Sequence, residues 1–127
     1  MQEKHLFEYA VIRVVPRVER EEFLNVGVIL YCKDLKFLKS RCDLNETRLV
    51  AFAKDIDTDE IKESLSAFCK ISSGSKDGGP IGKLDSASRF RWLTATRSTV
   101  VQTSKVHPGL CEDAQRTLDR LFDEMVL

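Results

Sequence analysis

The sequence predicts an α+β fold in which about three helices pack against an antiparallel or mixed sheet of three to five strands. Two apolar, β-branched segments follow each other near the N-terminus, helical patterns with capping residues occupy the middle, and an amphipathic stripe precedes the C-terminus. The chain has 127 residues, of which 43% are hydrophobic and 31% are charged. This size and composition are typical of one globular domain, which we place at residues 1–127.

Three strands are expected in the first third of the chain. Residues 8–15 are rich in β-branched side chains, which favour a strand. Residues 23–31 are apolar on both alternating faces, as in a central strand that is buried on both sides. Residues 33–34 predict a tight turn into a third strand at 35–41, antiparallel to the second.

Two helices and a loop are expected next. Asp43 stands three residues before a glutamate, which is the spacing of a capping box, and predicts a helix over 44–53. Asp57 repeats this spacing and predicts a second helix that ends near residue 71. Residues 72–82 are rich in glycine and serine and predict a flexible internal loop that could cover a site.

The last third is predicted to hold a helical turn, a strand and a long helix. Residues 84–93 begin as a helical turn, and residues 98–104 alternate as a strand. Residues 107–110, His-Pro-Gly-Leu, lead directly into the final helix. The apolar stripe of that helix consists of Cys111, Ala114, Leu118, Leu121, Phe122 and Met125.

The cysteines and the apolar segments indicate a reduced cytoplasmic protein. Cys32, Cys42, Cys69 and Cys111 are widely spaced and form no C-x-x-C pair, which argues against a zinc site and against a redox motif. A disulfide between two of them stays open. No apolar run has the length of a membrane span, and neither a metal nor a cofactor is expected.

Asn25 and Gly27 form the first candidate site. Strand alternation places both on one face, together with Phe23 and Ile29. Asparagine is disfavoured in a central strand unless its amide is hydrogen-bonded, and glycine leaves bare backbone where another segment or a ligand packs closely. Asn25 is therefore either a ligand-orienting amide on the floor of a pocket over Gly27, or a buried amide that satisfies a neighbouring loop.

The second candidate is a basic segment that runs through residues 89–99. Residues 81–107 carry a local charge of about +4 by simple counting. Arginine and hydroxyl groups suit phosphate or carboxylate, and Trp92 could stack on a base. In the structural alternative Trp92 is a core anchor and the arginines pair with acidic helices. The side chains concerned are Arg89, Arg91, Arg97, Ser98 and Thr99.

His107 supports a hypothesis of catalysis. It stands at the expected entrance to the last helix, where it could cap the helix, act as a general base, or face Cys111 across one turn. An enzyme acting on a phosphorylated or nucleotide substrate would use His107 or Glu22 to move protons, Arg91 and Arg97 to clamp charge, and Asn25 to orient the substrate. That hypothesis requires these side chains to converge in one cleft.

Two blocks of sequence carry a family resemblance. They are YAVIRVVPRVEREEFLNVGVILYC at 9–32 and SRFRWLTATRSTVVQTSKVHPGLCEDA at 88–114. They resemble the bacterial family catalogued as domain of unknown function 3037, which has no assigned activity. The positions that match its motifs are Glu22, Asn25, Gly27, Arg89, Arg91, Arg97, Ser98, Thr99 and His107.

The resemblance also implies a partner, because the family is loosely associated with neighbours that resemble HipA-type protein kinases. We therefore predict a small cytoplasmic binding or accessory module with an arginine-lined site for an anion or a protein partner. Enzymatic activity on a phosphorylated or nucleotide substrate is the alternative. Lys plus Arg and Asp plus Glu both number 20, which argues against nucleic-acid binding. A homodimer through an edge strand or the last helix stays open.

Overall fold

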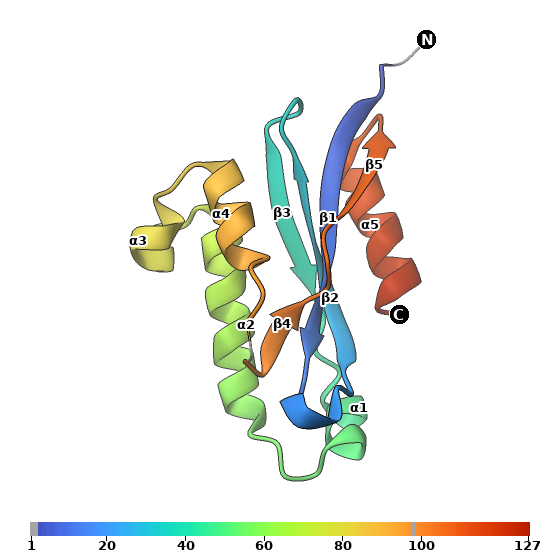
Figure 1. The fold of residues 1–127 in the computed structure, drawn as a ribbon, viewed down its shortest axis with the longest axis vertical. Helices are drawn as coiled ribbons and strands as arrows, with labels where there is room; N and C mark the ends of the chain where they lie inside the picture. Colours follow the sequence, from blue (N-terminus) through green and yellow to red (C-terminus); the bar gives the residue numbers. More distant parts are fainter. Residues whose placement is uncertain (1–2, 98) are drawn as a thin grey trace.

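The computed structural model describes residues 3–97 and 99–127, and its antiparallel five-stranded sheet with flanking helices confirms the α+β class (Figure 1). The strands are β1 (His5–Val14), β2 (Leu24–Cys32), β3 (Phe37–Cys42), β4 (Val101–Thr103) and β5 (His107–Cys111). The α-helices in the described part of the chain are α1 (Glu46–Phe52), α2 (Thr58–Ser73), α3 (Gly79–Gly82), α4 (Ser86–Leu93) and α5 (Ala114–Met125). Two short 3-10 turns lie at Val18–Arg20 and Lys76–Gly78.

Strand β1 lies between β2 on one side and the two short strands β4 and β5 on the other. The sheet order is β3-β2-β1-β4, and β5 also pairs with β1. Strand β5 runs opposite the first half of β1, and β4 runs opposite its last residues. Ser104 bridges the two halves: its hydroxyl accepts a hydrogen bond from the Val11 amide, and its own amide donates to the Val11 carbonyl, both at 2.8 Å.

Strand β2 is buried on both faces, as the sequence predicts. Helices α2 and α4 cover one face of the sheet and α5 covers the other (Figure 1). Ile29 and Tyr31 belong to the apolar cluster under α2 and α4, whereas Val28 and Leu30 belong to the cluster under α5. Each face of β2 therefore supplies half of the hydrophobic core.

The pairing of β1 with β2 is irregular near the start of β2. Ile12 pairs with Gly27, but Arg13 pairs with Asn25, so that Val26 is an extra residue. Beyond this bulge the alternation reverses, and Val26 joins the cluster under α2 while Asn25 reaches α5. The expectation that Asn25 and Gly27 share a face is therefore wrong, because a bulge shifts the period of two.

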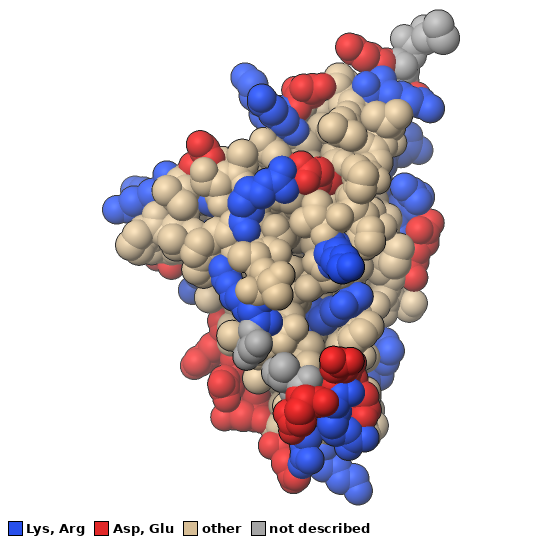
Figure 2. Space-filling view, in the orientation of Figure 1, with Lys and Arg blue, Asp and Glu red and all other residues tan. Residues whose placement is uncertain are grey.

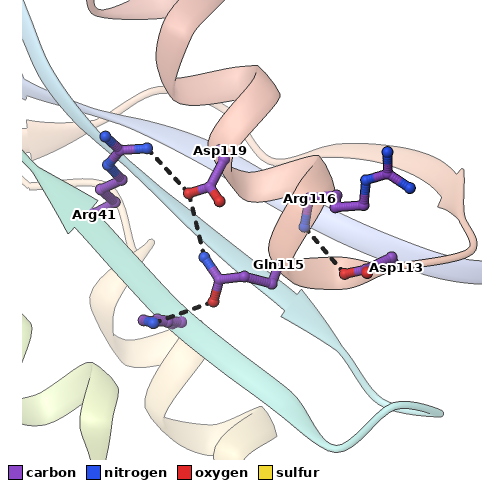
Figure 3. Close-up of polar contacts among 6 residues, drawn as sticks. Arg41, Asp113, Gln115, Arg116 and Asp119 are labelled. Carbon is purple, nitrogen blue, oxygen red and sulfur yellow. Dashed lines mark hydrogen bonds and ion pairs between the residues drawn. The ribbon is translucent and has the colours of Figure 1, made fainter.

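Helix α5 is fastened to β3 by polar side chains as well as by apolar packing (Figure 3). Arg41 donates to the Asp119 carboxylate at 3.0 Å, and its guanidinium lies 4.1 Å from the centre of the Phe122 ring. Gln115 donates to the same carboxylate at 3.2 Å and accepts from Lys39 at 3.1 Å. These contacts fix the rotation of α5 on the sheet.

The helix starts match the sequence in part. Asp57 caps α2 as predicted, by accepting from the Glu60 amide at 3.2 Å. Asn45, not Asp43, caps α1. Residues 84–93 hold a complete helix, α4, capped by Asp85, and the segment expected to be a loop contains α3.

The largest error concerns residues 107–110, which belong to β5 and do not lead into the last helix. His107 pairs with Tyr9, and Leu110 pairs with Leu6. Pro108 is tolerated because β5 is an edge strand, where one side of the backbone needs no partner. Cys111 therefore ends a strand and does not belong to the helical stripe, and it does not face His107 across a helical turn.

Within the described residues, none of the helices has the length and apolarity that crossing a bilayer requires.

Strand β4 covers only part of the strand expected at 98–104.

Replacing Asp113 tests where α5 begins. Its carboxylate accepts from the Arg116 amide at 3.1 Å as the N-cap, so Asp113→Ala is expected to reduce the free energy of unfolding by about 1 kcal/mol. Asp113→Asn keeps a capping oxygen and should leave it nearly unchanged. Urea denaturation measures both variants. If the helix began near Pro108, Asp113 would be interior, and alanine would stabilise the protein instead.

Candidate functional site

Arg89 is a structural residue. Its guanidinium donates to the carbonyls of Ile71 and Ser72 at 3.0 and 2.7 Å, which are exposed at the C-terminal end of α2. The same side chain donates to the Leu84 carbonyl and to the Ser86 hydroxyl. Arg89 thus joins α2 to α4, and each of its three guanidinium nitrogens donates a hydrogen bond.

The other two arginines of the segment also have local partners. Arg91 makes a two-pronged ion pair with Glu8 of β1, with both nitrogen–oxygen distances at 2.8 Å, and this contact raises the pKa of Arg91. Arg97 lies 3.9 Å above the Trp92 ring and donates to the Trp92 carbonyl. Trp92 is 39% exposed, so the expectation that it anchors the core is wrong; Phe90 and Leu93 fill that role.

The surface of this region agrees with the contacts. On the face drawn in Figure 2, basic side chains over α4 and the sheet are spread out between uncharged areas. Thr99 donates to the Val101 carbonyl at 2.8 Å, so its hydroxyl stabilises a local turn. Ser98 lies outside the described residues. The side chains of the basic segment that the structure describes therefore have local partners, and anion binding by this segment stays a prediction.

Asn25 takes the structural role that the sequence left open. Its amide donates to the Met125 carbonyl at 3.0 Å, which is exposed at the end of α5. Arg48 lies beside it and donates to the Val126 carbonyl at 3.4 Å. The Asn25 Oδ1 atom is buried without a hydrogen-bond partner among the described residues, as is Nε of its cross-strand neighbour Arg13. The guanidinium of Arg13 stacks on Phe23 at 3.9 Å.

Gly27 makes room for another strand. A Cβ atom on Gly27 would lie 2.7 Å from the Arg41 carbonyl oxygen and 2.8 Å from the sulfur of Cys42. Both belong to β3, so the close approach that the sequence indicated is made by a neighbouring segment.

His107 and Glu22 lie too far apart to act together. His107 stacks against Tyr9 with 5.4 Å between ring centres, whereas Glu22 precedes Leu24, the partner of Val14. Tyr9 and Val14 are separated by about 17 Å along β1 at the usual rise of a strand. The convergence that the enzyme hypothesis requires is not found among the described residues.

Glu22 lines a cavity of about 280 Å³ at the end of the sheet. The connection between β1 and β2 forms one wall, and the segment from the end of α1 toward α2 forms the other; both lie at the lower end of Figure 1. Acidic and basic side chains gather at this end in Figure 2. We call this hollow the basic cavity; its lining residues are Pro16, Arg17, Arg20, Glu22, Phe52, Ala53, Lys54, Asp55 and Ile56.

Charged and apolar side chains together line the basic cavity, with three cations and the two carboxylates of Glu22 and Asp55. Arg17 and Lys54 are exposed on opposite walls, and Arg20 pairs with Glu22 at 2.5 Å. Glu21, between these paired residues, adopts a left-handed conformation with φ of 56°, which costs a non-glycine residue about 1–2 kcal/mol. Such strain is found at binding sites, where it fixes the direction of neighbouring side chains.

Sequence reasoning identified one wall of this cavity only through Glu22. The charged run before Glu22 is visible in the sequence, but nothing local shows that Phe52 and Lys54 lie opposite. Their position depends on α1, whose buried Leu49 anchors it in the core beneath α2 and α4.

Comparison with known proteins gives one match. A family model described as "Protein of unknown function (DUF3037)" matches residues 9–126 of the 127-residue chain. No curated protein and no solved structure matches the chain.

Replacing the arginines one at a time tests their separate roles. Arg89→Gln should lower the free energy of unfolding by about 1–3 kcal/mol, because charge-assisted hydrogen bonds to helix-end carbonyls are lost. Arg91→Gln removes a solvent-exposed ion pair and should cost less than about 1 kcal/mol. Urea denaturation of both variants measures the difference. Equal losses of unfolding free energy in the two variants would contradict the assignment of a larger structural role to Arg89 than to Arg91.

Proposed function

The chain belongs to the family described as Protein of unknown function (DUF3037), and on that premise we propose that it is a binding module that holds a small anionic group in the basic cavity. One observation carries the proposal: Arg17, Arg20 and Lys54 line a single hollow together with apolar side chains, and these three cations outnumber its two carboxylates, Glu22 and Asp55. This keeps the arginine-lined anion site that the sequence predicts, but moves it from residues 89–99 to the end of the sheet.

The chemistry of the lining favours a carboxylate or a phosphate. A guanidinium offers paired donors that match the oxygens of either group, and a lysine adds a compact charge. Phe52 and Ile56 supply the apolar surface against which a short carbon chain would pack. A volume of about 280 Å³ lies just below the usual range for drug-sized ligands, so a small anion fits best.

Glu22 is the internal competitor for the site. Its carboxylate occupies Arg20 in the free protein, as a ligand carboxylate would. A bound anion would displace Glu22 from Arg20 and leave Glu22 exposed to solvent, where it is readily hydrated. Affinity for the anion therefore depends on how strongly Glu22 holds Arg20.

A cytoplasmic location and a protein partner, including a HipA-type kinase-like neighbour, stay predictions from the sequence. A binding module of this kind would respond to its anion and report it to such a partner. The homodimer also stays a prediction.

Titration with inorganic phosphate and with citrate tests the proposal. Both anions should raise the melting temperature at constant ionic strength, because a ligand that binds only the folded state stabilises it. Arg17→Gln and Lys54→Gln should each weaken binding about tenfold, which corresponds to about 1.4 kcal/mol. Glu22→Gln should strengthen binding, because it removes the competing carboxylate.

Arg116→Gln provides the matched control, since Arg116 is an exposed cation on α5, away from the basic cavity. It should bind both anions as the wild type does. A loss of anion binding in Arg116→Gln equal to that in Arg17→Gln would overturn the proposal. So would the absence of any shift in the melting temperature with either anion.

A further inference from the structure

The fold brings together two cysteines that are far apart in the sequence. Cys42 ends β3 and Cys69 lies in the last half of α2, and their sulfur atoms are 3.7 Å apart. Both thiols are free and neither residue is fully buried. Sequence spacing argued against a redox motif, but the packing of α2 on β3 creates a thiol pair that spacing cannot show.

Two serines complete the cluster around Cys69. The Ser40 hydroxyl lies 3.6 Å from the Cys69 sulfur and 2.7 Å from the Ser72 hydroxyl. The Ser72 hydroxyl also lies 2.9 Å from the Cys69 carbonyl. We define the thiol cluster as Ser40, Cys42, Cys69 and Ser72.

The protons of this cluster allow two arrangements, because each hydroxyl has only one hydrogen to donate. In the first, Ser40 donates to Ser72 and Ser72 donates to the Cys69 carbonyl. In the second, Ser72 donates to Ser40 and Ser40 donates to the sulfur of Cys69. The second arrangement stabilises a thiolate, so rotation of two hydroxyl groups suffices to accommodate ionisation of Cys69.

The electrostatics of the pair favour one thiolate. The hydrogen bond between the two thiols lowers the pKa of Cys69 to about 6; burial opposes this effect and the Ser40 hydroxyl adds to it. The same interaction, together with burial, raises the pKa of Cys42. Cys69 therefore loses its proton first, and Cys42 keeps the proton that stabilises the Cys69 thiolate.

Gly27 positions the second thiol. Because it has no side chain, the sulfur of Cys42 can lie directly over it, in the direction of α2. Gly27, singled out in the sequence as bare backbone, thus contributes to the geometry of the thiol cluster.

We propose that the thiol cluster is a site of reversible oxidation, in which Cys69 reacts with a hydroperoxide and Cys42 resolves the product as a disulfide. The Cys69 thiolate attacks one peroxide oxygen, so that a sulfur–oxygen bond forms and the oxygen–oxygen bond breaks. With hydrogen peroxide, the leaving hydroxide takes up a proton and becomes water. Cys42 then gives up its proton and attacks the sulfenic sulfur, a sulfur–sulfur bond forms, and a second water leaves.

The disulfide would connect the end of β3 to the last half of α2. A covalent sulfur–sulfur bond is about 2.0 Å long, so the two sulfurs must approach by about 1.7 Å. The resulting covalent loop runs from residue 42 to residue 69 and contains residues 52–56, which form one wall of the basic cavity. Closing such a loop restricts the unfolded chain and stabilises the folded protein.

A second cysteine pair on the other face of the sheet is the internal control. Cys32 is 0% exposed and Cys111 is 5% exposed, and the Cys32 thiol lies 3.4 Å from the Leu6 carbonyl. Burial raises the pKa of Cys111. Both thiols are buried, so they should stay reduced under conditions that oxidise the thiol cluster.

The first experiment treats the folded, reduced protein with stoichiometric hydrogen peroxide and maps its peptides by mass spectrometry without reduction. The expected product is a Cys42–Cys69 disulfide that dithiothreitol reverses, with Cys32 and Cys111 unmodified. Cys42→Ser should instead accumulate a Cys69 sulfenic acid that dimedone traps. In Cys69→Ser, the remaining Cys42 thiol should react with peroxide no faster than the buried thiols of Cys32 and Cys111. Oxidation of Cys32 and Cys111 at the same rate as Cys69, or an unreacted wild-type pair, would overturn the proposal.

The second experiment uses only the unmodified protein, so it does not depend on the folding of a variant. Alkylation by iodoacetamide is followed at each cysteine as pH rises. Cys69 should react with a midpoint near pH 6, because its thiolate forms there, and Cys42 should follow at much higher pH. A midpoint for Cys69 near that of an ordinary thiol, about pH 8.5, would contradict the assigned role. Phosphate binding measured separately keeps this result independent of the basic cavity.

Discussion

The burial of β2 on both faces is the constraint on which the rest of this structure depends. A strand with apolar side chains in both directions has to be covered twice, so the chain must supply one helical layer on each side of the sheet. Helices α2 and α4 form the first layer and α5 the second. Because these helices come from different parts of the sequence, residues of both α4 and α5 contact this one strand.

The bulge at Val26 distributes polar residues between the two layers. Without it, Asn25 and Gly27 would face the same helix. With the bulge, Asn25 turns toward α5 and donates to a helix-end carbonyl. Gly27 stays beside Cys42 of β3 and leaves space for its side chain. One extra residue in β2 thus directs the Asn25 amide toward α5 and leaves the space in which the Cys42 thiol approaches α2.

The sequence predicted those features that a short window determines. The double-sided burial of β2, the antiparallel β3 and the Asp57 cap all follow from local patterns, and the structure confirms them. Strand β5 could not be predicted in this way, because His-Pro-Gly-Leu has weak strand propensity and pairs only because β1 has a free edge. The same limit applies to the candidate site. Glu22 was identified, but its opposite wall and the Cys42–Cys69 contact depend on how α1 and α2 return to the sheet.

The roles of the arginines follow from where helices end. A helix leaves carbonyls without partners at its C-terminal end, and this chain satisfies them with long cationic or amide side chains: Arg89 at α2, and Asn25 and Arg48 at α5. Arg89, used in this way, is held by four hydrogen bonds to neighbouring segments. Arg17 and Arg20 stand instead on a connection between strands, where no helix end competes for them. Position relative to helix ends, more than local charge density, therefore separates the structural cations of this fold from those that can bind an anion.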